Sequence, residues 1–218
     1  MLGQNVAMGA LHPHRDGERI DDNPPWSPWT PDEVATLLSG VKARWYVVAG
    51  WALDLFRGQQ TRDHEDIEIG VASSDFTALR ASLGEYEFEV VGSVEGEDGM
   101  RWPLDRAAFD KHFQTWVREP VTGLYRLDIF RDPHDDDMWI CRRDDSIRLP
   151  YDQVIRLSST GIPYMSPEIV LIFKAKHNRE KDRNDFDGVR SLLSGGQLDW
   201  LRLNLNRIHP DHPWLEVL

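Results

Sequence analysis

One stretch constrains the fold more than any other, the alternation of polar and apolar residues in Asp66-Ile67-Glu68-Ile69-Gly70-Val71. A period of two is typical of a β-strand with one buried face. Side chains two positions apart share a face, so Asp66 and Glu68 project together, away from the isoleucines. The spacing alone leaves two interpretations open. The two acids line the solvent face of an edge strand, or they hold a cation such as Mg²⁺ between them.

The rest of the chain indicates an α/β body followed by helices. Thr30-Pro31-Asp32-Glu33 combines a cap, a first-turn proline and a capping-box acid, which predicts a helix start. Periodicity and turn residues place the other elements. We expect strands at 44–50, 66–71, 86–91, 113–118, 124–130, 138–142 and 147–150, helices at 30–38, 51–57, 75–83, 166–177, 182–193 and 198–208, and a loop at 92–99. The predicted organisation is an irregular N-terminal arm (1–29), an α/β body (30–160) and a helical C-terminal domain (161–218).

Charge and composition narrow the partners and the compartment. The 218 residues include 25 Lys and Arg against 37 Asp and Glu, a net charge of −12. This balance disfavours nucleic acid as a partner and fits a small molecule, including a cationic one. The single cysteine, Cys141, excludes an intrachain disulfide and suits a reducing cytoplasm. No apolar run reaches the roughly 20 residues of a bilayer span, and no secretory signal is visible. We expect a cytoplasmic protein without a membrane partner, and its oligomeric state stays open.

Two more features bear on the chemistry of the acidic pair. Ala49-Gly50 ends a predicted strand directly before a helix, where small residues let backbone N–H groups approach a phosphate. Asp128 lies inside the otherwise apolar strand of residues 124–130. If that strand neighbours the acidic pair, Asp128 becomes a third metal ligand or a general base. Otherwise it is a capped or paired structural acid.

Two motifs resemble the signature of the aminoglycoside 2''-adenylyltransferase and lincosamide nucleotidyltransferase group. They are Gly50-Trp51-Ala52-Leu53-Asp54 and, six residues later, Thr61-Arg62-Asp63-His64-Glu65-Asp66-Ile67-Glu68. In this group, part of the nucleotidyltransferase superfamily of DNA polymerase β, the pattern reads G-G-W-A-h-D and then T-R-x-H-x-D-h-[DE]. The likeness covers 47–71 well and extends loosely to 127–129 and to 167–182. It implies a nucleotidyltransferase fold, with a mixed sheet flanked by helices and a helical C-terminal domain.

The resemblance also implies an activity, Mg²⁺-dependent transfer of AMP from ATP to a hydroxyl of a small molecule. Asp66 and Glu68 would hold two Mg²⁺ ions, and Asp128 would help to hold metal and deprotonate the acceptor. The candidates for contacts with the nucleotide are Ala49, Gly50, Arg62, Lys174, Lys176 and Lys181. Ala49 replaces the first glycine of the family pattern, and Glu68 replaces the commoner aspartate.

Blander interpretations accompany these assignments. Lys181 is four residues before Asp185, the spacing of a helical ion pair, and helical lysines are commonly just solvated. His64 is expected to orient the loop before Asp66 rather than to bind metal. The acidic balance fits a polycationic aminoglycoside as acceptor. The alternatives are a catalytically silent binding protein of the same fold, or a nucleotidyltransferase that acts on a protein or an RNA end.

Overall fold

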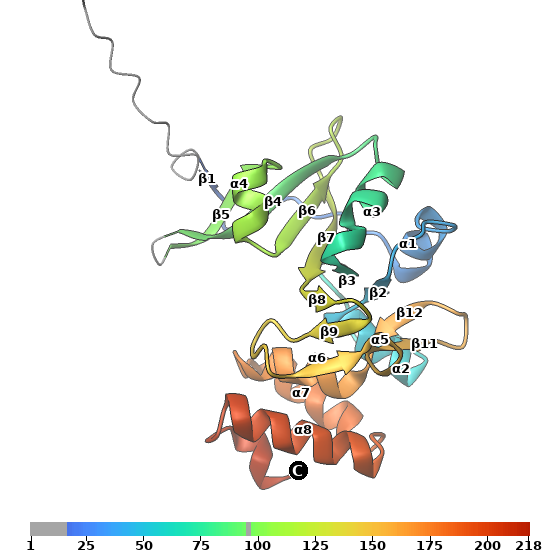
Figure 1. The fold of residues 1–218 in the computed structure, drawn as a ribbon, viewed down its shortest axis with the longest axis vertical. Coiled ribbons are helices and arrows are strands. Elements are labelled where there is room, and N and C mark those ends of the chain that lie inside the picture. Colours follow the sequence, from blue (N-terminus) through green and yellow to red (C-terminus); the bar gives the residue numbers. More distant parts are fainter. Residues whose placement is uncertain (1–16, 95–96) are drawn as a thin grey trace, which may run out of the picture.

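The computed structural model describes residues 17–94 and 97–218, and within them the chain forms a large mixed sheet with helices (Figure 1). Nine described strands pair in the order β1-β5-β4-β6-β7-β3-β2-β12-β11. Their bounds are β1 Glu18–Arg19, β2 Trp45–Val47, β3 Glu68–Ala72, β4 Glu87–Val94, β5 Glu97–Pro103, β6 Gln114–Arg118, β7 Tyr125–Asp132, β11 Ile155–Leu157 and β12 Pro163–Met165. A second sheet has the order β10-β9-β8, from β8 His134–Asp135, β9 Met138–Ile140 and β10 Arg148–Pro150.

The helices are distributed along the chain and gather at its C-terminal end. Their bounds are α1 Pro31–Leu37, α2 Ala49–Arg57, α3 Phe76–Ser82, α4 Arg106–Lys111, α5 Tyr151–Val154, α6 Pro167–Ala175, α7 Glu180–Arg190 and α8 Gly195–Ile208, with 3₁₀ turns at Ser73–Asp75 and Pro213–Glu216. Figure 1 shows α6, α7 and α8 at the end of the molecule opposite β4 and β6. Most of α6 is buried, because it packs against both α2 and α8.

The centre of the large sheet combines parallel and antiparallel pairs, so the predicted mixed sheet is confirmed. β3 runs parallel to β7, with Glu68 opposite Asp128, and antiparallel to β2. Ile67 and Ile69 are fully buried in the main core. Burial of these apolar side chains orients β3 and leaves its acidic face toward the opposite side.

Local signals placed several elements accurately. Thr30 and Glu33 form the expected capping box at the start of α1. Gly58 adopts the left-handed conformation (φ 75°) that ends α2, which glycine adopts without steric cost.

Other expectations need correction. The predicted loop at 92–99 is wrong, since β4 extends to Val94 and β5 begins at Glu97; residues 95–96 lie outside the described part. Asp66 precedes β3 instead of lying within it. The structure also contains β5, α4, β11 and β12, which no strong periodicity marks. β12 pairs with β2 within the large sheet, although it belongs to the range 161–218 expected to be helical.

The N-terminal arm can be followed only in part. Residues 1–16 lie outside the described residues. The described remainder is irregular apart from β1, which pairs with β5, and a bridge between Trp26 and Tyr125. No helix in the described part of the chain has the length and apolar character needed to cross a membrane.

Candidate active site

Three carboxylates meet where β3 and β7 lie side by side. Asp66 leads into β3, Glu68 is its first residue, and Asp128 lies opposite Glu68 on β7. One oxygen from each carboxylate lies within 4.8 Å of the other two. The parallel register therefore brings the lone acid of β7 to the acidic pair of β3.

Burial raises the pKa of all three groups, and at Glu68 and Asp128 the neighbouring acids of the cluster raise it further. Burial, then Asp66, raises the pKa of Glu68 to about 7. The pKa of Asp128 rises well above its usual value because the group is buried and faces the other two acids. The pKa of Asp66 is raised by burial, against an opposing effect of Lys181. Like charges in a poorly hydrated site disfavour the ionised form unless a cation compensates them.

The hydrogen bonds of Asp128 leave one of its oxygens available. Gln114, on the neighbouring strand β6, donates to Oδ2 at 2.6 Å, whereas Oδ1 is buried without a hydrogen-bond partner. A buried polar atom without a partner is costly. Three clustered carboxylates with such an oxygen suit a hard cation that prefers oxygen ligands, which Mg²⁺ is. The residues present therefore fit the metal.

Asp54 organises the loop that carries Asp66. One of its oxygens contacts the His64 Nε2 at 2.7 Å, and the other accepts a hydrogen bond of 2.6 Å from the Thr61 hydroxyl. The His64 ring also stacks on Trp51, with ring centroids 4.3 Å apart. The motif that contains Trp51 and Asp54 thus contacts the motif that contains Thr61 and His64. His64 orients the loop before Asp66, the role predicted for it.

Gly50 permits the same loop to approach helix α2. A Cβ at position 50 would lie 2.7 Å from His64 Cε1 and would also clash with the Arg62 guanidinium. A side chain here would push both residues away. The close contact between α2 and the loop of Arg62 and His64 therefore requires glycine at position 50, in addition to any contact of Gly50 with a phosphate.

Ala49 adopts a left-handed backbone conformation, with φ 53°. L-residues other than glycine enter this region at a cost of about 1–2 kcal/mol. The left-handed conformation is one that glycine, the residue of the family pattern, adopts without this cost, whereas alanine keeps the turn and accepts the strain. It lies at the first residue of α2, beside the cavity.

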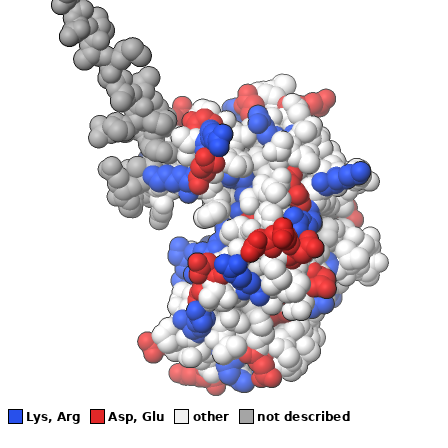
Figure 2. Space-filling model, in the orientation of Figure 1, with Lys and Arg blue, Asp and Glu red and all other residues white. Residues whose placement is uncertain are grey.

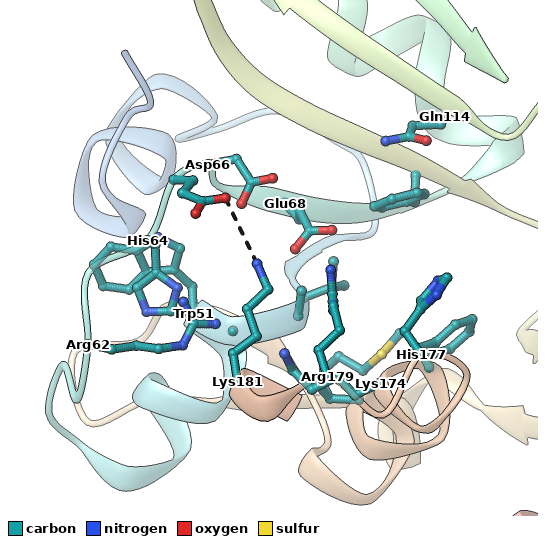
Figure 3. A pocket seen from close by; sticks show the side chains of 18 of the residues that line it. Trp51, Arg62, His64, Asp66, Glu68, Gln114, Lys174, His177, Arg179 and Lys181 are labelled. Atoms are coloured by element: carbon teal, nitrogen blue, oxygen red, sulfur yellow. Dashed lines mark ion pairs between the residues drawn. The ribbon is translucent and has the colours of Figure 1, made fainter. Parts of the chain in front are cut away.

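A cavity of about 370 Å³ opens over the carboxylates (Figure 3). Among the expected nucleotide contacts, the structure brings Ala49, Gly50, Arg62, Lys174 and Lys181 to its wall, together with Asp66 and Glu68. Lys176 is exposed and does not line it. Lys174 is buried in ion pairs with Asp185 at 2.7 Å and Asp182 at 3.5 Å. Lys181 is 3.9 Å from Glu65 and does not form the expected pair with Asp185.

Sequence reasoning missed a group of residues on the same wall. They are Trp51, Gln114, Phe130, Arg142, Arg143, Phe173, His177 and Arg179. Phe130 follows Asp128 by two positions and so shares its face of β7, a signal that the alternation already contained. Gln114 lies on β6, and the others come from turns and helices whose approach to the sheet cannot be predicted from a local pattern.

One family model matches part of the chain. Residues 32–100 match the family model of the aminoglycoside-2''-adenylyltransferases, a range that includes Gly50, Asp66 and Glu68. Over this range, about a third of the chain, the sequence is similar to that family. The match confirms the resemblance that the two motifs indicated. Asp128 and the helical lysines lie beyond the matched range.

Solved structures show the same fold over most of the chain. The lincomycin-bound lincosamide antibiotic adenylyltransferase LnuA is 17% identical, with a TM-score of 0.51, and the match covers 81% of this chain and all of LnuA. ANT(2'')-Ia in complex with adenylyl-2''-tobramycin is 12% identical, with a TM-score of 0.55 over 81% of this chain and 94% of the other. No curated protein sequence matches significantly.

Proposed function

We propose that this enzyme transfers AMP from ATP to a hydroxyl group of a small molecule, with Mg²⁺ held by Asp66, Glu68 and Asp128. The observation that carries the proposal is the convergence of these three carboxylates within 4.8 Å on adjacent strands. A silent scaffold gains nothing from three clustered acids, since their mutual repulsion destabilises the fold. The supporting comparison is the family match over residues 32–100.

The triphosphate of ATP is assigned to the wall formed by Gly50 and Arg62. The first turn of α2 offers unpaired backbone N–H groups, and the positive end of the helix dipole favours an anion. Arg62 adds a guanidinium that can bind phosphate oxygens. It is held 3.5 Å from Asp185 and donates to the Asp63 carbonyl at 3.0 Å.

At the α-phosphorus the reaction forms one bond and breaks one, and a proton moves from the acceptor hydroxyl to Asp128. The acceptor oxygen bonds to the α-phosphorus of ATP, and the bond from that phosphorus to the bridging oxygen of pyrophosphate breaks. Pyrophosphate leaves with the electron pair of the broken bond and so carries the negative charge. Two Mg²⁺ ions, when bound, would stabilise the attacking and leaving oxygens. Asp128, in its ionised form, accepts the proton of the hydroxyl. Gln114 fixes the orientation of this carboxylate through Oδ2.

The relatives support a hydroxyl-bearing small molecule as acceptor. Lincomycin is bound in one related structure, and the other holds an adenylylated tobramycin. Antibiotics of the lincosamide and aminoglycoside types are therefore the first compounds to test.

The test combines binding with transfer. Mg-ATP should raise the unfolding temperature more than ATP alone, because ligand bound only to the folded state adds stability. ATP labelled at the α-phosphate should then transfer label to an acceptor, with release of pyrophosphate. Asp66→Asn should lose both effects, whereas Asp187→Asn, an exposed acid on α7, should keep them. No shift with Mg-ATP at millimolar concentration would favour a silent binding protein.

A further inference from the structure

The charge of the cavity wall is opposite to that of the whole chain. The net charge is −12, yet the described Lys and Arg residues of the wall outnumber Asp and Glu six to three. The cations are Arg62, Arg142, Arg143, Lys174, Arg179 and Lys181, and the acids are Glu65, Asp66 and Glu68. Five of these cations form ion pairs with described acids, so among the described residues of the wall Arg143 is the cation without an ion pair. On the face shown in Figure 2, Lys and Arg also crowd one flank of the lower half, beside the hollow between the two halves.

The three acids of the wall already have assigned partners. Asp66 and Glu68 belong to the carboxylate cluster proposed to hold Mg²⁺. Glu65 lies 3.9 Å from Lys181. No described acid of the wall is therefore left to pair with amino groups of a polycationic acceptor. Such a molecule would instead meet the like charges of Arg143 and of the Arg142 Nη groups, which disfavour binding.

The cavity has two sides, separated by the carboxylates. Figure 3 shows Trp51, Arg62 and His64 on one side of Asp66 and Glu68, and Gln114 and His177 on the other. The first side carries the N-terminus of α2, assigned to the triphosphate. The second side contains Gln114, whose amide contacts the proposed base Asp128. The acceptor hydroxyl must reach that base, so the acceptor occupies the second side.

Arg142, another residue of the cavity wall, is held in place by an ion pair and by two aromatic rings. Its Nε donates to the fully buried Asp132 at 2.8 Å, and Asp132 also accepts a hydrogen bond from the Tyr46 hydroxyl. The guanidinium lies 4.4 Å from the ring centre of Phe130 and 5.1 Å from that of Phe173. Nε is the only guanidinium nitrogen engaged by a hydrogen bond among the described residues. Its Nη groups stay available to a ligand.

Arg143 adds a charge without a counter-ion. Its guanidinium lies 5.7 Å from the Phe173 ring centre and forms no ion pair with any described residue. The nearby His177 has a lowered pKa, first through burial and then through three cations, Lys176, Arg179 and Arg143. Lowering of this kind reports a positive local field.

We propose that the acceptor is a hydroxyl compound with an anionic group, a carboxylate or a phosphate, which Arg142 and Arg143 bind while the hydroxyl faces Asp128. The inference rests on the proposed function and specifies its acceptor. Arginine recognises both anions through paired N–H donors. The same two arginines disfavour a polycationic aminoglycoside relative to an anionic acceptor.

The experiment compares probes of matched size and different charge. The Mg²⁺-loaded protein, saturated with a nonhydrolysable ATP analogue, is titrated calorimetrically with gluconate, glucose 6-phosphate, methyl glucoside and tobramycin. We expect at least one of the two anionic probes to bind about ten- to hundredfold more tightly than methyl glucoside, the range for charge-assisted hydrogen bonds. Gluconate and glucose 6-phosphate distinguish a carboxylate from a phosphate.

A second part of the experiment reverses the charge of Arg143. Arg143→Glu should abolish the preference for the anionic probe, and because Arg143 is exposed the variant should fold. Arg202→Glu on α8, remote from the cavity wall, should preserve it. Tighter binding of tobramycin than of both anions, equal binding of anions and methyl glucoside, or an unchanged preference in Arg143→Glu would each overturn the inference. Loss of ATP-analogue binding itself would instead refute the proposed function.

Discussion

Lys174 Nζ lies 2.7 Å from Asp185 Oδ2, and both side chains are buried. This pair joins α6 to α7, and Asp185 also lies 3.5 Å from the Arg62 guanidinium. The Asp185 carboxylate thereby connects α6 and α7 with the wall assigned to the triphosphate. A lysine expected to bind phosphate is held by protein acids and contributes to the assembly of the site.

The first prediction concerns the stability of this connection. Asp185→Asn should lower the free energy of unfolding by about 3 kcal/mol, because it leaves a buried ammonium with only the weaker contact to Asp182. Denaturant unfolding followed by tryptophan fluorescence measures the change. The exposed Asp187→Asn on the same helix should stay within about 0.5 kcal/mol of the parent protein. An equal decrease in the free energy of unfolding in both variants would show that the buried pair contributes no more to stability than an exposed acid.

The second prediction uses the strained backbone at position 49. Ala49→Gly should raise the free energy of unfolding by about 0.5–1 kcal/mol, because glycine relieves the left-handed strain but loses more chain entropy on folding. Ala35→Gly, in the ordinary helix α1, should lower it by about 0.5–1 kcal/mol. Opposite signs in matched thermal melts are the expected result. A destabilised Ala49→Gly would mean that the alanine methyl makes a packing contribution larger than the strain.

The third prediction concerns pH and metal. Glu68 has a pKa of about 7 in the folded state against 4.5 as the ordinary value. The folded state binds the proton more tightly between these values, so the stability of the metal-free protein should fall as pH rises from 4.5 to about 7. Mg²⁺ competes with that proton, and its stabilising effect should be larger at about pH 8 than at about pH 5.5.

Unfolding temperatures with Mg²⁺ and with EDTA across this range provide the measurement. Glu68→Gln should flatten the metal-free dependence, because the amide does not titrate. It should also weaken the response to Mg²⁺. A Mg²⁺ effect that is independent of pH would exclude the acidic cluster as its origin.

The fourth prediction separates catalysis from binding. Asp128→Asn should reduce transfer by about 10²–10⁴-fold or more, because the amide accepts no proton and is a poorer metal ligand. Binding of Mg-ATP should largely remain, since Asp66 and Glu68 are intact. Turnover is measured as pyrophosphate release with a working acceptor, and binding as the shift in unfolding temperature. Near-normal turnover would make Asp128 a structural acid and place the base elsewhere.

Local sequence patterns predicted many of the helices and strands and two of the three carboxylates of the site. The alternation in Ile67-Glu68-Ile69 predicted a strand with one apolar face, and both isoleucines are fully buried. The capping box of Thr30 and the glycine stop at Gly58 marked helix ends, because capping and positive φ depend on a few adjacent residues. The short spacing between Asp66 and Glu68 likewise placed these two acids together.

Contacts between distant segments were decided only by the tertiary structure. Asp128 joins the acids because β7 pairs in parallel with β3, a register that buries apolar side chains on both strands and leaves no trace in local periodicity. The same packing withdrew Lys174 into a buried pair and brought Arg142 and Arg143 to the cavity wall. The net negative charge of the chain could be predicted from its composition. The basic wall was not, because a local field depends on which charges folding brings close and which it neutralises.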